Sequence, residues 1–121
     1  MIEKVSLWQI AHLLPEAKKT GLTFCNSTEY YAFYHDGCIV AITGLVWYKN
    51  KAVFKNSFVL PKHRGYGIYR TMFDFRLQLA KSRNIRTIEA TCTKMSLKLW
   101  LDKGAVLIKQ YKLYSKVQLP I

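Results

Sequence analysis

The sequence predicts an α/β fold in which helices flank one mixed, mainly antiparallel sheet. Three observations lead to this prediction. Three strand-like segments follow one another closely, separated by short turn signals, as in an antiparallel meander. A basic, glycine-rich turn then joins the third strand to a helix with an apolar face. A strand–helix–strand crossover follows, and such a connection makes its two strands parallel.

The length and composition indicate a single folded domain over residues 1–121. Half of the residues are hydrophobic (50%) and the mean hydropathy is close to zero, which excludes a disordered chain. We expect no membrane segment and no signal peptide, because the apolar runs are too short. Cys25, Cys38 and Cys92 are widely spaced and odd in number. This pattern favours reduced, mostly buried thiols in a cytoplasm over disulfides or a zinc site.

The first half of the chain is predicted to form one helix and three antiparallel strands. Apolar residues recur at helical spacing in the first segment, and a proline follows near its end. The second strand is almost continuously apolar, as expected of a strand buried on both faces. A His-Asp-Gly hairpin signal precedes it. The predicted elements are a helix over residues 5–14, with Leu7, Trp8, Ile10, Ala11 and Leu14 on one face, and strands over residues 30–34, 38–48 and 52–60.

The second half is predicted to alternate helices and strands. The longer helix begins at Ile68 and has one apolar face. In the next strand, apolar and polar residues alternate, which indicates one buried face. The elements are a helix from 68 to about 84 with Ile68, Met72, Phe75 and Leu79 on its apolar face, a strand over 85–93, a short helix over 96–103, and strands over 105–111 and 113–119.

A basic turn with two glycines joins the strand at residues 52–60 to the longer helix. Lys62 and Arg64 place positive charge there. Gly65 and Gly67 let the backbone approach a bound group, because no Cβ stands in the way. The unpaired N–H groups and the dipole at a helix N-terminus attract anions. The turn is therefore predicted to be a phosphate cradle, with an ordinary strand-to-helix turn as the alternative.

This junction resembles the signature of the GNAT N-acyltransferase superfamily, Arg/Gln-x-x-Gly-x-Gly/Ala, often written out as Val-x-Pro-x-x-Arg-Gly-x-Gly-Ile-Gly. In that family the turn holds the pyrophosphate of coenzyme A. The order of the predicted elements is also that of the GNAT fold from about residue 5, with the family's first strand abbreviated. Tyr69 departs from the pattern, because it occupies the position of the last Gly/Ala. The matching residues are Val59, Pro61, Arg64, Gly65, Gly67 and Ile68.

The resemblance implies a site for acetyl-CoA, or for another acyl-CoA, and no metal. In the GNAT fold the parallel strands splay apart, and the pantetheine arm lies in the gap against the end of the first of them. The residues that this implies for cofactor binding are Phe58, Val59, Leu60, Lys62, His63, Arg64, Gly65, Tyr66, Gly67, Ile68 and Tyr69 around the turn, and Thr93 and Ser96 further along the chain.

Residues 93–105 resemble the family's second motif, Asn-x-x-Ala-x-x-Leu-Tyr-x-x-x-Gly-Phe. Trp100 stands where the family has a tyrosine that often protonates the leaving thiolate, and an indole N–H is not a practical acid. Tyr111 and Tyr114 are the candidates to replace it. The strand before the turn lacks the glutamate that serves many family members as a base. Glu89 is the candidate base, although a role as ion-pair partner for a basic side chain is the simpler interpretation.

The charge distribution predicts a second, anionic partner. Of the net charge of +12, residues 1–48 contribute three Lys/Arg against four Asp/Glu, and residues 49–121 contribute sixteen against three. Coenzyme A would use only part of this field, so nucleic acid or an acidic protein face is a natural partner, with general solubility as the alternative. The predicted strand over residues 30–34 is rich in aromatic side chains. One side of it is expected to lie in the core, and the other could stack on a nucleobase. This strand carries Tyr30, Tyr31, Phe33 and Tyr34.

The sequence thus predicts an acyl-CoA-dependent N-acyltransferase, most simply an N-acetyltransferase that acts on an amine of a macromolecule. Two alternatives stay open: a GNAT-like enzyme that modifies an amino group of a nucleic-acid base, and a GNAT-shaped binding protein that has lost catalysis. The small size and lean motifs resemble short members of the superfamily encoded by bacteriophages, which would place the protein in a host cytoplasm.

Overall fold

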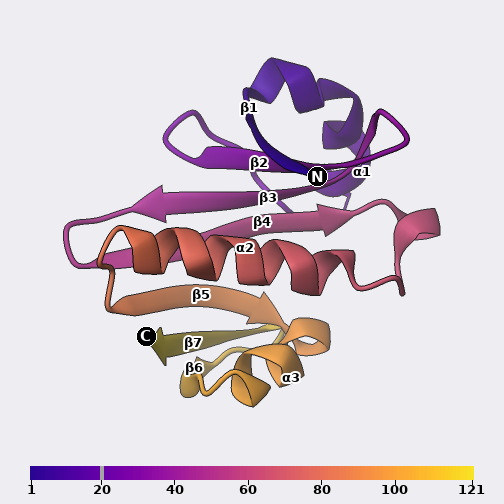
Figure 1. Cartoon of the computed structure of the whole chain (residues 1–121). Helices are drawn as coiled ribbons and strands as arrows, with labels where there is room; N and C mark the ends of the chain where they lie inside the picture. The colour runs from indigo at the N-terminus through magenta and orange to yellow at the C-terminus, as the bar shows by residue number, and fades with distance from the viewer. Residues whose placement is uncertain (20) are drawn as a thin grey trace. The chain divides into compact units, whose positions relative to one another are not determined.

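The computed structural model describes residues 1–19 and 21–121. Its strands form a seven-stranded sheet in the order β1-β2-β3-β4-β5-β7-β6 (Figure 1). Strands β4 and β5 are parallel, whereas β1–β2, β2–β3, β5–β7 and β6–β7 are antiparallel. The predicted mixed sheet with flanking helices is therefore confirmed. The elements are β1 (Ile2–Val5), η1 (Leu7–Leu13), α1 (Leu14–Lys18), β2 (Glu29–His35), β3 (Cys38–Trp47), β4 (Lys51–Val59), η2 (Pro61–His63), α2 (Ile68–Ser82), β5 (Thr87–Thr93), α3 (Lys94–Asp102), β6 (Val106–Gln110) and β7 (Tyr114–Pro120).

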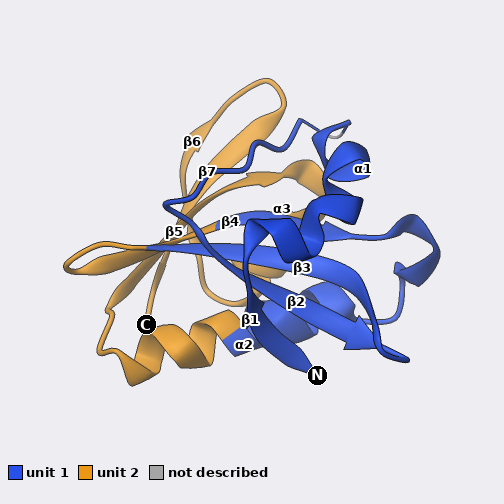
Figure 2. Ribbon diagram, turned by 90° about the horizontal axis from the view of Figure 1, so that it is seen from above, with its two compact units in different colours: residues 1–46, 55–75 blue, residues 47–54, 76–121 orange. Residues whose placement is uncertain are grey.

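The chain divides into two compact units (Figure 2). Unit 1 comprises Met1–Val46 and Lys55–Phe75, and unit 2 comprises Trp47–Phe54 and Arg76–Ile121. Strand β4 and helix α2 each contribute residues to both units. The assignment of residues 1–121 to one domain stays a prediction.

Unit 1 is built on strands β2 and β3 and on the C-terminal part of β4. Asp36 and Gly37 close the β2–β3 hairpin with φ angles of 50° and 77°, which a tight hairpin turn requires at both central positions. Two apolar clusters fill the interior. One contains Val5, Ile10, Leu13, Ala17, Tyr30, Ala32, Ile42 and Phe58. The other, named here the Met72 cluster, contains Val40, Ala41, Val59, Ile68 and Met72.

Unit 2 is built on strands β5, β7 and β6. The predicted alternation in β5 is confirmed: its even-numbered residues are buried and oppose buried residues of β7. Helix α3 packs its Trp100 ring 5.5 Å from the Phe54 ring, and the tryptophan is 1% exposed. Burial of such a side chain stabilises the fold by roughly 1.5–3 kcal/mol. The buried residues of the β5–β7 pair are Ile88, Ala90, Cys92, Ser115, Val117 and Leu119.

The prediction of one helix over residues 5–14 is wrong in two respects. Val5 ends strand β1, and the segment is a 3₁₀ helix that continues as α-helix α1 only from Leu14. Pro15 lies in the first turn of α1 and not at the C-terminal end of a helix. A proline is tolerated in the first turn, because the N–H that it lacks would have no intrahelical partner there. The predicted face is also wrong at Trp8, which is 79% exposed. A pattern over ten residues does not distinguish 3.0 from 3.6 residues per turn.

Two further predictions about burial need correction. In α2 the buried residues are Ile68, Met72, Phe73, Arg76 and Ala80, whereas Phe75 and Leu79 are only half-buried. The buried face of α2 is thus rotated relative to the predicted face, and it includes Arg76. In β2, Tyr30 and Tyr31 are both buried, so neither side of this strand is free to stack on a base at that point.

Cys25 and Cys38 are exposed and only Cys92 is buried, so the expectation of mostly buried thiols is wrong, although all three are free as expected. Over residues 1–19 and 21–121, no helix combines the length and the hydrophobicity needed to cross a membrane.

Candidate functional site

The glycine turn begins where β4 leaves the sheet in unit 1. Phe58 and Val59 are buried, and the Leu60 N–H donates to the Val40 carbonyl of β3 at 2.9 Å. One step earlier on β4, the hydroxyl of Ser57 lies 2.7 Å from that of the buried Thr43. These bonds fix the register of β4 against β3. The turn is therefore held on a rigid strand end.

Two glycines shape the turn itself. Gly65 has a φ of 85° and Gly67 a φ of 79°, a region that side chains with a Cβ rarely adopt. A Cβ built at either position would meet nothing within 4 Å. The conformation, and not crowding, thus demands glycine. It leaves open space directly in front of the backbone, as a phosphate cradle needs.

Helix α2 starts immediately after the second glycine. The Thr71 N–H and the Thr71 hydroxyl both donate to the Gly67 carbonyl at 3.0 Å. This is the first bond of the helix, so the N–H groups of the three residues before Thr71 have no acceptor within it. The partial positive charge of these groups attracts an anion, and α2 has 15 residues whose peptide dipoles add to it.

Arg64 fastens the turn to the strand. Its Nε donates to the Val59 carbonyl at 2.9 Å, and its guanidinium carbon lies 5.5 Å from the centre of the Phe58 ring. The side chain remains exposed, as does that of Lys62. Arg64 therefore combines two roles: it holds the turn in place, and it contributes a full positive charge beside the open helix N-terminus.

The remaining turn residues divide into inward and outward ones. Tyr69, which departs from the family pattern, is half-buried and packs against the Met72 cluster. Tyr66 is 79% exposed. The half-buried His63 ring lies 5.7 Å from the ring of the exposed His35, in an edge-to-face arrangement. Tyr69 is thus part of the packing that seats the start of α2.

A break in β4 was not anticipated from the sequence. Asn56 has a φ of 56° in the middle of the strand, and its side-chain amide donates to the Thr23 carbonyl and contacts the Tyr30 hydroxyl at 3.5 Å. A residue in this conformation disrupts the ladder and turns the neighbouring peptide groups. The available signal was the asparagine itself, because asparagine tolerates positive φ better than other side chains in a strand.

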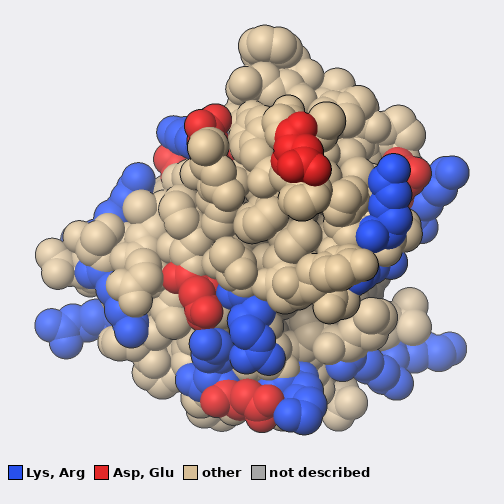
Figure 3. All heavy atoms as spheres, turned by 45° about the vertical axis from the view of Figure 1, so that its right-hand side comes forward, with Lys and Arg blue, Asp and Glu red and all other residues tan. Residues whose placement is uncertain are grey.

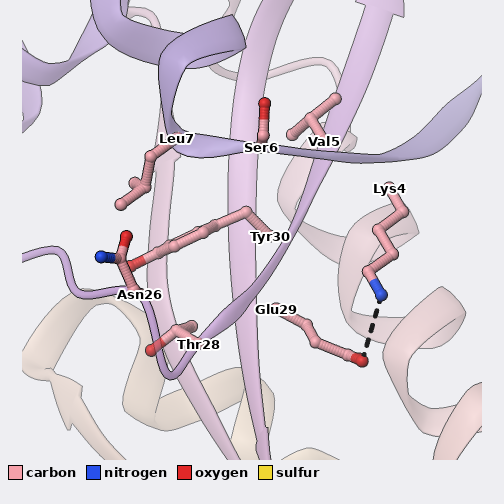
Figure 4. Close-up of a pocket in the computed structure, with 8 residues that line it drawn as sticks. All are labelled: Lys4, Val5, Ser6, Leu7, Asn26, Thr28, Glu29 and Tyr30. Atoms are coloured by element: carbon pink, nitrogen blue, oxygen red, sulfur yellow. Dashed lines mark hydrogen bonds and ion pairs between the residues drawn. The ribbon is translucent and has the colours of Figure 1, made fainter.

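The cavity shown in Figure 4 lies in unit 1, near the end of β1 and the start of β2, and has a volume of about 280 Å³. Lys4 and Glu29 form an ion pair of 3.3 Å beside it. None of the residues predicted for the cofactor lines this cavity, so we do not assign the cofactor to it. The lining residues are Lys4, Val5, Ser6, Leu7, Asn26, Thr28, Glu29 and Tyr30.

The other predicted cofactor residues, Thr93 and Ser96, lie at the junction of β5 and α3 in unit 2. Thr93 is the N-cap residue of α3, and the Ser96 hydroxyl donates to the Thr93 carbonyl at 3.3 Å. Burial raises the pKa of the neighbouring Cys92 thiol, which keeps it neutral. Thr93 is exposed and Ser96 half-buried, so both hydroxyls have access to solvent.

Glu89, the candidate base, is engaged in an ion pair in unit 2. Its Oε2 accepts from the Lys51 ammonium at 3.0 Å and its Oε1 from the Gln118 amide at 3.4 Å. The Lys51 ammonium holds the pKa of the Glu89 carboxyl below its usual range, against the opposing effect of burial. A carboxylate with a lowered pKa is a weaker base, which supports the simpler interpretation of Glu89.

The pairing makes a prediction about stability. Because the pKa of Glu89 is lowered by folding, its stabilising effect is present above the ordinary glutamate pKa of about 4.3 and is lost as the pH falls through the folded value. Glu89→Gln should lower the free energy of unfolding at pH 7 by about 0.5–1 kcal/mol, a small value because Lys51 is partly exposed. Urea unfolding of the parent protein and the variant at pH 7 and pH 3 measures this loss and its dependence on pH.

The matched control is Asp102→Asn, which removes the exposed Lys98–Asp102 pair of 2.8 Å within α3. Such a pair stabilises a helix by about 0.3–0.5 kcal/mol. A Glu89→Gln loss that persists unchanged at pH 3 would contradict the prediction, since the carboxylate would not be its cause.

The candidate acids Tyr111 and Tyr114 lie at the hairpin between β6 and β7. They are 45% and 43% exposed, and the Tyr111 N–H donates to the Tyr114 carbonyl at 2.7 Å. Tyr114 is also the register partner of Thr93 on β5. Trp100, in contrast, is buried against Phe54 and belongs to the core. Unit 2 therefore brings Thr93 and Tyr114 onto neighbouring strands, and unit 1 brings the residues of the glycine turn together.

Cys25 is a reactive group that sequence reasoning did not single out. Its Sγ lies 3.2 Å from the Ser27 hydroxyl and 3.3 Å from the Thr28 hydroxyl. Hydrogen bonds from Ser27 and then Thr28 lower the pKa of this exposed thiol to about 7. About half of the molecules should then carry a thiolate at neutral pH.

We expect iodoacetamide to alkylate Cys25 with a rate that rises through a midpoint near pH 7, followed by mass spectrometry of the peptides. Removal of both hydroxyls (Ser27→Ala with Thr28→Val) should raise this midpoint toward the ordinary thiol pKa of about 8.5. Cys38, which is also exposed, serves as the internal reference in the same sample. An unchanged midpoint in the double variant would show that the two hydroxyls do not stabilise the thiolate.

The comparisons with known proteins agree with this geometry. Residues 5–100 match the model of the acetyltransferase (GNAT) family. No curated protein sequence matches the chain. Among solved structures, a PaiA N-acetyltransferase from Thermoplasma acidophilum in complex with coenzyme A superposes with a TM-score of 0.82 at 11% identity, covering 100% of this chain and 98% of that one.

Two further solved structures cover all of this chain. The IAA acetyltransferase from Bacillus cereus has a TM-score of 0.78 at 14% identity, over 99% of its own chain. A GNAT family acetyltransferase from Elizabethkingia anophelis with acetyl-CoA bound has a TM-score of 0.72 at 13% identity, over 97% of its chain. At these identities the likeness establishes the fold, and the family follows from the match to residues 5–100. The chain belongs to the acetyltransferase (GNAT) family.

Proposed function

We propose that this protein binds acetyl-CoA, or a related acyl-CoA, at the glycine turn and transfers the acyl group to an amine of a macromolecule. The observation that carries the proposal is the turn itself. Gly65 and Gly67 hold positive φ angles with open space in front of them, directly before the N-terminus of α2. Similar folds bind coenzyme A and acetyl-CoA.

The residues of the turn fit a pyrophosphate by their chemistry. Backbone N–H groups supply donors without bulk, and the side chains of Lys62 and Arg64 supply charge from the exposed side. The buried Phe58 and Val59 hold the preceding strand end in place. When bound, acetyl-CoA supplies the thioester that reacts with the amine. The chain's own contribution at this point is to hold and orient it.

The proton transfers are assigned by exclusion among this chain's residues. The part of β4 in unit 1 carries Lys55, Asn56 and Ser57 but no carboxylate. Glu89 could act as the base only after its ion pair with Lys51 had broken. Loss of the amine proton to solvent needs no such step, so we propose it as the simpler route. Tyr111 and Tyr114 are the proposed proton donors to the leaving thiolate, since both phenols are accessible.

A second candidate function has its own support. The engaged Glu89 and the buried Trp100 leave the familiar base and acid positions unfilled, as expected of a GNAT-shaped protein that binds a partner without catalysis. Whether or not such a protein kept acyl-CoA binding, it would not catalyse acyl transfer.

Two measurements separate these functions. Titration calorimetry of acetyl-CoA and of free coenzyme A tests the cradle, with micromolar binding expected. Release of free thiol from acetyl-CoA, measured with a chromogenic disulfide in the presence of candidate protein or nucleic-acid acceptors, tests transfer. Binding with acceptor-dependent thiol release supports the transferase. Binding without release across amine acceptors supports the binding protein. An absence of binding contradicts the cradle and the transferase, and supports the binding protein more strongly.

A further inference from the structure

The two units differ strongly in charge. Unit 1 carries seven Lys/Arg against five Asp/Glu, a net charge of +2, whereas unit 2 carries twelve against two, a net charge of +10. Figure 3 shows a group of lysine and arginine side chains at the bottom of the view and others at both sides. Proposed acyl-CoA binding at the turn of unit 1 does not account for this field, because the charge belongs to the other unit.

Part of this charge lies on one face of the β5–β7–β6 sheet. Lys109 of β6 and Lys116 of β7 are register partners, and Thr91 of β5 continues the same row. Two like charges directly opposite each other on a sheet are destabilising. Among the residues that the structure describes, neither lysine forms an ion pair. Lys116 interacts electrostatically with Glu89 of the same face, which carries a single negative charge and is already paired with Lys51. The two lysines are therefore only partly neutralised, and a bound anion would stabilise them further.

Aromatic rings stand next to these lysines. Tyr114 lies on the same face, two residues from Lys116 along β7, and is 43% exposed. Tyr111, at the hairpin tip, is 45% exposed, and the Lys109 Nζ lies 5.0 Å from the centre of its ring. Cations beside accessible aromatic rings match a ligand that alternates phosphates with planar bases.

We propose that this surface docks single-stranded nucleic acid. The surface, named here the basic face, consists of Thr91, Lys109, Tyr111, Tyr114 and Lys116, with the exposed Lys112 of the hairpin between β6 and β7. The lysines neutralise phosphates, and the tyrosines stack on unpaired bases. Tyr111 and Tyr114 are also the proposed proton donors of acyl transfer, so binding at the basic face is measured without acyl-CoA, where that role does not enter.

Two other occupants fit the structure less well. A second copy of the chain would bring another +10 against the same surface, which opposes association. An extended peptide would pair with the free edge of β6, the last strand of the sheet. However, the register of β6 shifts between Leu107 and Lys109, and a bulge and a lysine are the devices by which proteins protect a sheet edge from added strands.

The test is fluorescence anisotropy of the full chain with a labelled 15-nucleotide oligothymidylate at 50 and 200 mM salt. If each of the three lysines neutralises one phosphate, affinity should fall about 20-fold between the two conditions, since each contact contributes a log–log slope of about −0.7. Lys109→Gln with Lys116→Gln should make this slope shallower by about 1.4. Tyr111→Ala should weaken binding at least about fivefold without changing the slope.

The matched control is Lys49→Gln with Lys81→Gln. It removes the same charge from exposed positions of unit 2 outside the basic face and should leave the slope unchanged. Melting curves confirm that each variant is folded. Equal slope changes in the two double variants would overturn the proposal in favour of a diffuse field. Tighter binding of a 15-residue polyglutamate than of the oligonucleotide would overturn it in favour of an acidic protein partner, and an absence of binding at 50 mM salt would also overturn it.

Discussion

Replacement of Gly67 by glutamate should abolish acetyl-CoA binding while leaving the protein folded. The space in front of Gly67 is open, so a side chain there would project to where the proposed pyrophosphate lies. Its carboxylate would also occupy the anion site itself. Two unit charges 5 Å apart at an effective dielectric constant of 20 repel by about 3 kcal/mol, so titration calorimetry should show a loss of about two orders of magnitude or more.

Part of the effect of this substitution is backbone strain, since Gly67 has a φ of 79°. The strain amounts to about 1–2 kcal/mol for a residue with a Cβ, and Gly67→Ala measures it alone. Gly104→Glu is the matched control, because Gly104 has a φ of 100° at the other end of α3 from Thr93. It adds the same charge and similar strain in unit 2, at a residue that is not part of the turn. A comparable affinity loss in Gly104→Glu would contradict a local role for Gly67.

The glycine turn could be predicted from the sequence because its determinants are local. A positive φ at Gly65 and Gly67 is a property of single residues, and the helix begins directly after Gly67. The chemistry of an anion site at a helix N-terminus needs no distant partner. The alternation in β5 is local in the same sense, because a period of two follows from the strand alone.

The features that the sequence did not predict share a different cause, because each depends on residues that are distant along the chain. Strand β1 is four residues long and exists because Ile2 to Val5 pair with β2, some 30 positions away. A helical pattern predicts an exposed position for a charged residue such as Arg76. Arg76 is nevertheless 1% exposed, and its guanidinium carbon lies 4.1 Å from the Phe54 ring centre. The break at Asn56 is held by Tyr30 and Thr23 from other segments. Sequence periodicity carries none of this information.

The role of Trp100 could be predicted only in part. The motif position showed that a tyrosine was missing, but not that its replacement would lie in the core. Because the indole is 1% exposed and packs on Phe54, its identity is a matter of packing and not of acid catalysis. This distinction leads to a prediction about stability that does not depend on any proposed activity.

Trp100→Ala should destabilise the protein by about 3–5 kcal/mol, because it removes a large buried ring and leaves a cavity. The free energy of unfolding expected for 121 residues is roughly 6–18 kcal/mol, so this is a large fraction of the total. Urea unfolding should show the midpoint lowered by about 1 M or more at the usual slopes. Trp100→Phe should recover most of the loss, since it refills much of the space.

Trp8→Ala provides the matched control, because it is the same substitution at a tryptophan that is 79% exposed. It should change the free energy of unfolding by less than about 0.5 kcal/mol. If both alanine variants unfolded at the same midpoint, Trp100 could not be a core residue, and a place in the site would return as its explanation. A large loss in Trp100→Ala alone, recovered by phenylalanine, would instead assign the tryptophan to the packing of α3 on β4. The acid of the proposed reaction would then have to come from another residue or from solvent.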